Sequence, residues 1–123
     1  MRILVVDDNV GSAQILSRLL AKLGDHQVWT AYDGPTTLET AKACHPELVL
    51  LDIGLPHISG YEVAQKLREQ PESNSALLVA VTGYGTEDDV RRAREAGFDR
   101  HLTKPASVDD LRQLLADPIL SWG

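Results

Sequence analysis

The sequence predicts an α/β domain built on a doubly wound parallel sheet with helices on both faces. Three apolar runs, at residues 3–6, 48–51 and 77–81, have the length and branched side chains of strands buried on both faces. They alternate with segments of helical periodicity, and parallel strands need such crossovers. The 123 residues, 43% of them apolar, suffice for one such domain with its own core.

The first half of the chain supplies two predicted strands and two predicted helices. A helix is indicated after residues 3–6, because apolar residues recur on one helical face and stop at Gly24. They are Ile15, Leu16, Leu19, Leu20 and Leu23. Residues 28–31 mix polar with apolar side chains, which is typical of a strand at a sheet edge. The next helix is expected to begin near Pro35, because proline suits a first helical turn.

The second half continues the alternation. Ser59, Thr86 and Ser107 each precede an acidic residue by three positions, the spacing of an N-terminal capping box, and we expect helices to begin there. Gly97 is expected to end the helix that follows Thr86. Residues 98–102 again mix polar and apolar side chains and are predicted as the second edge strand. The chain therefore contains five predicted strand–helix units, with the three apolar runs in the middle of the sheet.

Bulk properties indicate the setting and the domain limits. Residues 1–116 are expected to form one domain, and residues 117–123 a C-terminal tail or linker stub. The net charge of −6, with dispersed Lys and Arg residues, disfavours direct binding of nucleic acid. The single Cys44 and the lack of an apolar leader or long apolar span favour a cytoplasmic protein with no membrane contact.

Residues able to do chemistry lie at the carboxyl ends of the predicted strands. Ligands of parallel sheets bind in the crevice beyond those ends. Asp7 and Asp8 follow the first strand, and Asp52 follows the third. Thr82 follows the fourth strand and Lys104 lies just beyond the fifth. We therefore expect these five side chains to share one pocket.

The same residues predict a bound cation. Three carboxylates in one cleft would raise one another's pKa unless positive charge is near, and the chain supplies only Lys104 there. Clustered carboxylate oxygens favour Mg²⁺, whereas Zn²⁺ prefers cysteine and histidine clusters, and the four histidines are scattered. Asp7 and Asp8 are better placed than Asp52 to hold the ion.

The chemistry that this set favours is attack on phosphorus. Mg²⁺ and Lys104 would offset the charge of a phosphoryl group, while Thr82 would hydrogen-bond one of its oxygens. Asp52 is then the predicted nucleophile.

Four segments resemble the signature segments of response-regulator receiver domains. They are Val5-Val6-Asp7-Asp8-Asn9, Leu50-Leu51-Asp52-Ile53-Gly54-Leu55-Pro56, Val81-Thr82-Gly83 and Leu102-Thr103-Lys104-Pro105. The resemblance covers about residues 2–115 and implies a flavodoxin-like (βα)5 fold with strand order 2-1-3-4-5. Residues 97–105 are similar to receiver domains attached to hybrid sensor histidine kinases.

The resemblance also assigns roles to individual residues. It implies Asp52 as the phosphoacceptor, with a histidine kinase or histidine phosphotransfer domain as the donor. The implied phosphoryl sensors are Thr82 and Lys104. The implied Mg²⁺ ligands are Asp7, Asp8, Asp52 and the backbone carbonyl of Gly54. A cis peptide is expected at Lys104-Pro105. A covalently linked kinase or output domain outside this chain is compatible with the resemblance.

One position departs from the family pattern. The residue three before the family lysine is usually Tyr or Phe and acts as a rotating aromatic switch, but here it is His101. His101 and Pro105 are therefore candidate switch or interaction residues. Tyr84 is another candidate, because it could line or cover the phosphoryl pocket.

Three other functions remain open. A degenerate receiver would keep the fold and act only as an interaction scaffold. An aspartate-nucleophile phosphohydrolase of the haloacid dehalogenase type normally needs Asp-x-Asp after its first strand, whereas here Asp7 and Asp8 are adjacent. A nucleotide or flavin module would need a glycine-rich phosphate loop, and none follows a predicted strand. No enzymatic activity is expected beyond self-catalysed phosphoryl transfer and autodephosphorylation.

Overall fold

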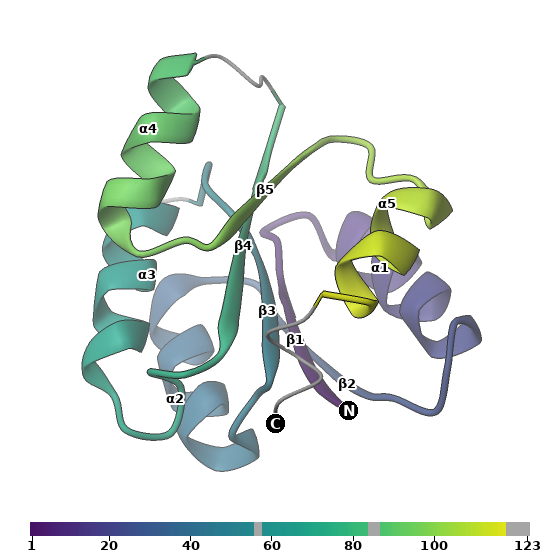
Figure 1. Ribbon diagram of the computed structural model, residues 1–123. Coiled ribbons are helices and arrows are strands. Elements are labelled where there is room, and N and C mark those ends of the chain that lie inside the picture. The colour runs from purple at the N-terminus through teal and green to yellow at the C-terminus, as the bar shows by residue number, and fades with distance from the viewer. Residues whose placement is uncertain (56–57, 84–86, 118–123) are drawn as a thin grey trace.

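The computed structural model describes residues 1–55, 58–83 and 87–117. Within them, five parallel strands form one sheet in the order β2-β1-β3-β4-β5, which confirms the predicted fold (Figure 1). The strands are β1 (Arg2–Val6), β2 (Gln27–Ala31), β3 (Leu48–Asp52), β4 (Leu77–Thr82) and β5 (Arg100–Thr103). The helices are α1 (Val10–Lys22), α2 (Gly34–Cys44), α3 (Gly60–Glu69), α4 (Glu87–Ala96) and α5 (Val108–Leu115).

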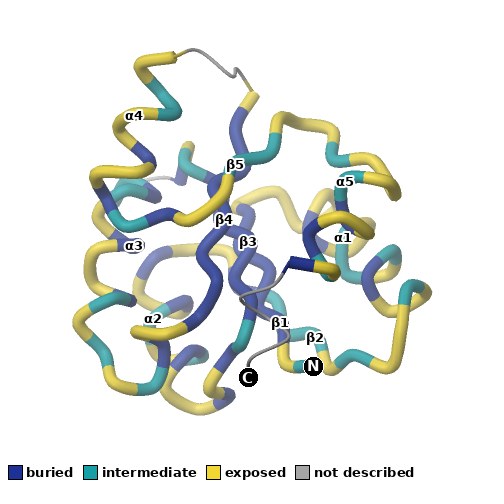
Figure 2. The backbone as a smooth tube through the Cα atoms, in the orientation of Figure 1, coloured by how far each residue is buried: buried dark blue, intermediate teal, exposed yellow. Residues whose placement is uncertain are grey.

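The burial of the strands follows their apolar content. Every residue of β3 and β4 is buried, and so is all of β1 after Arg2 (Figure 2). The mixed strands β2 and β5 lie at the two edges and are mostly half-buried or exposed. The three apolar runs therefore occupy the middle of the sheet, as predicted, because strands covered on both faces need apolar side chains on both sides.

Two layers of helices cover the sheet. Helices α2, α3 and α4 lie on one face, and α1 and α5 lie on the other (Figure 1). Alternate residues of one strand belong to opposite cores: Leu51 packs with the α2–α4 layer, and Leu50 packs with the α1–α5 layer. The alternation follows from the two-residue period of side chains along a strand.

Several helix ends form where the sequence predicts them. Ser107 and Asp110 make a complete capping box at the start of α5, and the Ser59 hydroxyl accepts from the amide of Glu62 at the start of α3. Gly97 closes α4 with φ +107°, a left-handed conformation that favours glycine. Thr86 lies outside the described residues.

Two predictions about the elements are wrong in detail. Phe98 was expected in the fifth strand, but β5 begins at Arg100, and Phe98 lies in the connection from α4, only 5% exposed within the core. Its amide donates to the carbonyl of Ala93, so the turn after α4 takes up this residue before strand pairing begins. Ile15 is predicted to share one apolar face of the first helix with Leu20, but it is 61% exposed on α1 whereas Leu20 is fully buried.

At the carboxyl end, α5 stops at Leu115 with Ala116 as its C-cap. Asp117 is 8% exposed and accepts from the guanidinium of Arg100 at 2.7 Å, which ties it to β5. Residues 118–123 lie outside the described residues, so the proposed division into domain and tail stays a prediction. None of the described helices is long and apolar enough to cross a membrane.

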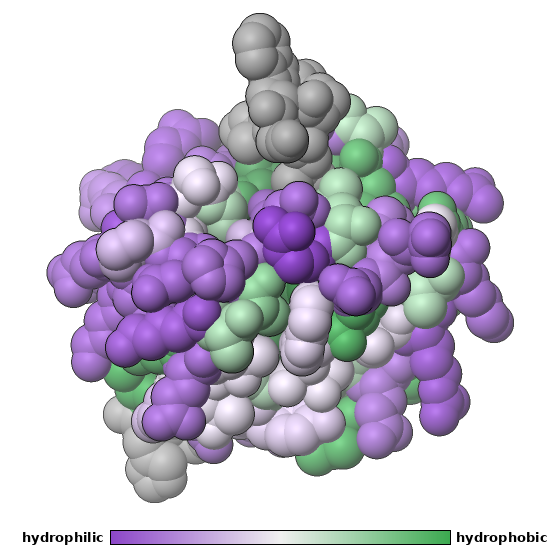
Figure 3. Space-filling model, turned by 90° about the horizontal axis from the view of Figure 1, so that it is seen from below, coloured by the Kyte–Doolittle hydropathy of each residue, from purple (hydrophilic) through white to green (hydrophobic). Residues whose placement is uncertain are grey.

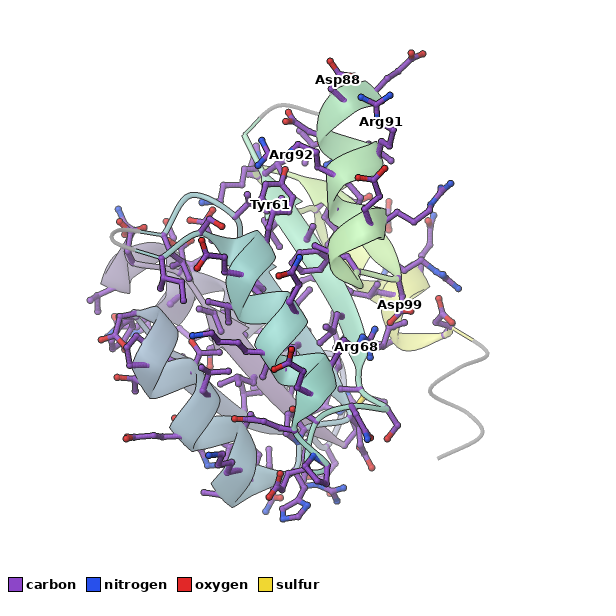
Figure 4. The ribbon with its side chains drawn as sticks, turned by 90° about the vertical axis from the view of Figure 1, so that its left-hand side faces the viewer. Tyr61, Arg68, Asp88, Arg91, Arg92 and Asp99 are labelled. Atoms are coloured by element: carbon purple, nitrogen blue, oxygen red, sulfur yellow. The ribbon has the colours of Figure 1, made fainter. Side chains whose placement is uncertain are left out.

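The guanidinium of Arg68, on α3, joins the α3–β4 connection to the α4–β5 connection on one side of the molecule (Figure 4). It donates to the carbonyls of Asn74, Ala76 and Gly97 at 2.7–2.9 Å, and to the carboxylate of Asp99 at 2.6 Å. Arg92 of α4 stacks on the Tyr61 ring of α3, with 4.5 Å between the guanidinium carbon and the ring centroid.

Arg68→Met is expected to lower the free energy of unfolding by about 2–3 kcal/mol, because it removes the donor from the part-buried hydrogen bonds to the carbonyls of Ala76 and Gly97. Urea unfolding followed by circular dichroism measures the change. Arg91→Met is the matched control: its side chain is 69% exposed and pairs with Asp88 on the same helix, so we expect a change within about 0.5 kcal/mol. Equal losses in the two variants would contradict a structural role for Arg68.

One face of the molecule lies at the amino ends of the strands. Seen from below, this face carries hydrophilic side chains over most of its visible area (Figure 3). Arg2 and Glu47 form an ion pair there at 3.5 Å, and the Arg2 side chain also donates to the carbonyl of His45. The predicted site residues lie at the other end of the sheet, where the strands have their carboxyl ends.

Candidate functional site

The site lies at the carboxyl ends of β1, β3 and β4 and in the connection after β5. Asp7 follows β1, while Asp52 and Thr82 are the last residues of β3 and β4. The Lys104 ammonium bridges two of these positions, at 2.9 Å from Asp52 Oδ2 and 3.3 Å from Asp7 Oδ2. One lysine thus pairs with two carboxylates that are 45 residues apart in sequence.

Each of these carboxylates is oriented by its own loop. Asp7 Oδ1 accepts from the amide of Asn9 at 2.9 Å, and Asp52 Oδ1 accepts from the amide of Gly54 at 3.0 Å. The Oδ1 atoms are therefore held by backbone, and the Oδ2 atoms face Lys104. Asn9 also caps α1, because its side chain accepts from the amide of Ser12.

A glycine lets α3 begin directly beside the β3 end. A Cβ at Gly60 would lie 2.6 Å from the Cα of Ile53 and 2.7 Å from the carbonyl oxygen of Asp52, and both of these are backbone atoms. The amide of Gly60 donates to the carbonyl of Ile53 at 2.9 Å. This close approach fixes the loop that carries Gly54.

Burial and charge shift two pKa values in the site. Burial raises the pKa of Asp7, and the Asn9 amide and the Lys104 charge only partly offset it. Burial acts to lower the pKa of Lys104, but its hydrogen bond and charge interactions with Asp52 and Asp7 outweigh this and leave the pKa raised. Lys104 is therefore a full ammonium at neutral pH.

The three acidic residues form a cluster that suits a metal ion. Asp7, Asp8 and Asp52 each offer one carboxylate oxygen, and these oxygens lie within 4.8 Å of one another. Asp7 and Asp52 are buried and Asp8 is exposed. Hard oxygen donors of this kind, open to water on one side, fit Mg²⁺, which keeps several waters when bound to protein.

Thr82 completes the site and connects it to the sheet edge. Its side chain is buried, and its Oγ1 lies 2.8 Å from Nε2 of His101 on β5. Its carbonyl accepts from the amide of Lys104 at 2.7 Å. The predicted switch position therefore contacts the predicted phosphoryl sensor directly.

A cavity of about 360 Å³ adjoins the carboxylates on the α1 side. Its polar end holds Asp7 and Lys104, and apolar residues of α1, Ile15 among them, line the rest. Pro105 forms part of the wall, and the Lys104-Pro105 peptide is cis, which confirms that prediction. This exposed apolar wall was not predicted, because helical periodicity alone does not distinguish an inward face from an apolar surface.

Five predicted site residues thus meet at one edge of the sheet: Asp7, Asp8, Asp52, Thr82 and Lys104. The Gly54 carbonyl as a metal ligand stays a prediction. Tyr84 lies outside the described residues.

Residues 3–116 match the family model of the response regulator receiver domain. The polar-differentiation response regulator DivK of Brucella ovis is 32% identical over 106 residues, which are 86% of this chain and 85% of DivK. The sensor histidine kinase RcsC of Escherichia coli is 33% identical over 115 residues, which are 94% of this chain and 12% of the kinase. The receiver domain of a Pseudomonas aeruginosa sensor histidine kinase, solved with a magnesium ion in its active-site cleft, superposes with a TM-score of 0.85 at 26% identity, over 96% of each chain.

Proposed function

This chain belongs to the response regulator receiver domains of two-component signalling, and from that premise we propose that Asp52 accepts a phosphoryl group from a phosphohistidine. The observation that carries the assignment is the pairing of Asp52 with the Lys104 ammonium, at 2.9 Å, inside a cluster of three carboxylates. A buried carboxylate oriented by a backbone amide and a lysine is preorganised for nucleophilic attack.

In the proposed reaction, one carboxylate oxygen of Asp52 forms a bond to phosphorus as the bond from phosphorus to the donor imidazole nitrogen breaks. The released imidazole takes up a proton from solvent. Gly54 keeps the Oδ1 atom of Asp52 in place, and Lys104 balances the charge that moves toward the new acyl phosphate. In this proposal, Thr82 donates its hydroxyl proton to a phosphoryl oxygen.

The proposed cofactor is Mg²⁺, held by Asp7, Asp8, Asp52 and the Gly54 carbonyl. When bound, it would offset charge on the phosphoryl oxygens. The magnesium ion in the similar Pseudomonas receiver domain supports this choice. Asp8, the exposed member of the cluster, leaves one side open for water and a phosphoryl oxygen.

The proposed donor is a histidine kinase or a histidine phosphotransfer domain. The cavity beside Asp7 and Lys104, with exposed Ile15 at its apolar end, offers the donor a contact surface next to the phosphoacceptor. The match to a short part of RcsC supports a further proposal, that a kinase or output domain is linked to this chain. A cytoplasmic setting, which the single Cys44 favours, belongs to the same proposal.

The intact mass after incubation with acetyl phosphate tests this function. We expect one phosphoryl adduct per chain in the presence of Mg²⁺ and none when EDTA replaces the metal. An adduct that forms equally in EDTA would contradict the metal assignment. Failure of acetyl phosphate, phosphoramidate and a phosphorylated histidine phosphotransfer domain to give any adduct would favour a receiver that serves only as an interaction scaffold.

A further inference from the structure

The contact between Thr82 and His101 joins a proposed phosphoryl sensor to a titratable ring. The two side chains lie on the neighbouring strands β4 and β5. Ala80 is opposite His101 in the register, and Thr82 follows two residues later, so both side chains face the α4 layer. The distance of 2.8 Å between Thr82 Oγ1 and His101 Nε2 is that of a direct hydrogen bond.

The protonation of His101 decides whether Thr82 donates or accepts the hydrogen bond between them. A threonine hydroxyl has one proton to donate, and a neutral imidazole has one N–H and one lone pair. If Nε2 of His101 carries no proton, Thr82 donates its proton to the ring. If Nε2 is protonated, the ring donates to Thr82 Oγ1, and the hydroxyl proton is available to another acceptor. An imidazolium always donates, because both of its nitrogens carry protons.

The charged oxygens of a phosphoryl group on Asp52 only accept hydrogen bonds. Thr82 can donate to them only when Nε2 of His101 is protonated and donates to Thr82 Oγ1. We propose that His101 is a positioning residue for phosphoryl transfer: its protonated Nε2 donates to Thr82 and turns the Thr82 hydroxyl proton toward the phosphoryl group. This inference rests on the proposed function of Asp52. The neutral ring donates from Nε2 only as its Nε2–H tautomer, whereas the imidazolium always does, so phosphoryl uptake depends on the charge of a side chain that does not itself touch the phosphoryl group.

Three charged residues lie near the His101 ring. On α4, Arg94 lines the same cavity of about 320 Å³ as His101. Asp99 and Arg100, which precede His101, are engaged elsewhere: Asp99 with Arg68, and Arg100 with Asp117.

The Lys104 ammonium, in the connection after β5, donates to Asp52. On the described part of β4, the residues that pair with β5 are Val79, Ala80, Val81 and Thr82, and none of these is charged. A phosphoryl group that accepts the Thr82 hydroxyl proton favours the arrangement in which Nε2 of His101 donates to Thr82. Proton binding by His101 and phosphoryl binding by Asp52 should therefore reinforce each other, as linkage requires.

The test compares rates of phosphoryl uptake from acetyl phosphate at saturating Mg²⁺, across the range from about pH 5.5 to 8 in which histidine changes charge. The variant is His101→Phe, which keeps an aromatic ring and cannot titrate. The ratio of wild-type to variant rates is taken at each pH, so the pH dependence of the donor and of metal binding cancels. We expect the ratio to rise about tenfold from the alkaline to the acidic end, the effect of one charge-assisted hydrogen bond.

The control is His45→Asn, at the opposite end of the sheet. His45 is exposed and has φ 50°, a conformation that asparagine tolerates. Its pH profile should match that of the wild type. A flat ratio for His101→Phe, with both proteins still forming the adduct, would overturn the dependence of phosphoryl uptake on the charge of His101 and leave the proposed function standing. Absence of the adduct from both would instead remove the proposed function.

A measurement on the wild type does not depend on how the variant folds. The ¹⁵N shift of His101 Nε2 reports whether that nitrogen carries a proton. We expect it protonated in the phosphorylated domain. An unprotonated Nε2 in the phosphorylated state would refute the proposal.

Discussion

Asp52→Asn is expected to abolish phosphoryl uptake while the fold stays intact. An amide is a poor nucleophile toward phosphorus, so no acyl phosphate can form at this position. Asparagine has nearly the same shape as aspartate, and its side-chain oxygen can still accept from the Gly54 amide. Intact mass with acetyl phosphate and Mg²⁺ gives the readout, and urea unfolding checks the fold.

Asp25→Asn is a suitable control, because Asp25 is exposed near the amino ends of the strands. It makes the same chemical change away from the site and should leave uptake at the wild-type rate. Uptake that survives in Asp52→Asn would assign the nucleophile to another carboxylate.

Lys104→Met is expected to lower the rate of phosphoryl uptake about 10²–10³-fold, the usual effect of removing one preorganised donor from a transition state. The ammonium contacts both Asp52 and Asp7, and it is the cation that the structure places between them. Methionine keeps an unbranched apolar chain of similar length, so the cavity wall should persist.

The control for Lys104→Met is Lys66→Met on the exposed face of α3. Time-resolved intact mass at saturating Mg²⁺ compares the two variants, and Lys66→Met should keep the wild-type rate. A change of less than about threefold in Lys104→Met would show that the lysine does not act on the transferring group.

Much of the fold could be predicted because its signals are local. The runs that became β1, β3 and β4 are apolar on both faces, and only a covered strand tolerates that pattern. Capping at Ser107 and the left-handed Gly97 likewise depend on a few neighbouring residues. The place of Phe98 is not local: its ring packs into the core from a connection, and tertiary packing decides where β5 begins.

The sequence predicts which residues share the site, because parallel strands bring their carboxyl ends to one edge of the sheet. The details within the site depend on long-range geometry. No spacing indicates that one lysine pairs with both Asp7 and Asp52, or that the ring of His101 reaches the hydroxyl of Thr82. These contacts join residues 19–97 positions apart, so only the folded chain reveals them.

The most direct test of the central claim locates the phosphoryl group. Borohydride reduction of the acyl phosphate converts the phosphorylated aspartate to homoserine, which peptide mass spectrometry identifies. Trypsin releases residues 43–66 as one peptide, in which Asp52 is the only aspartate, and residues 3–18 as another, which carries Asp7 and Asp8. Homoserine in peptide 43–66 is the result predicted here, and homoserine in peptide 3–18 would contradict the assignment of Asp52 as the phosphoacceptor.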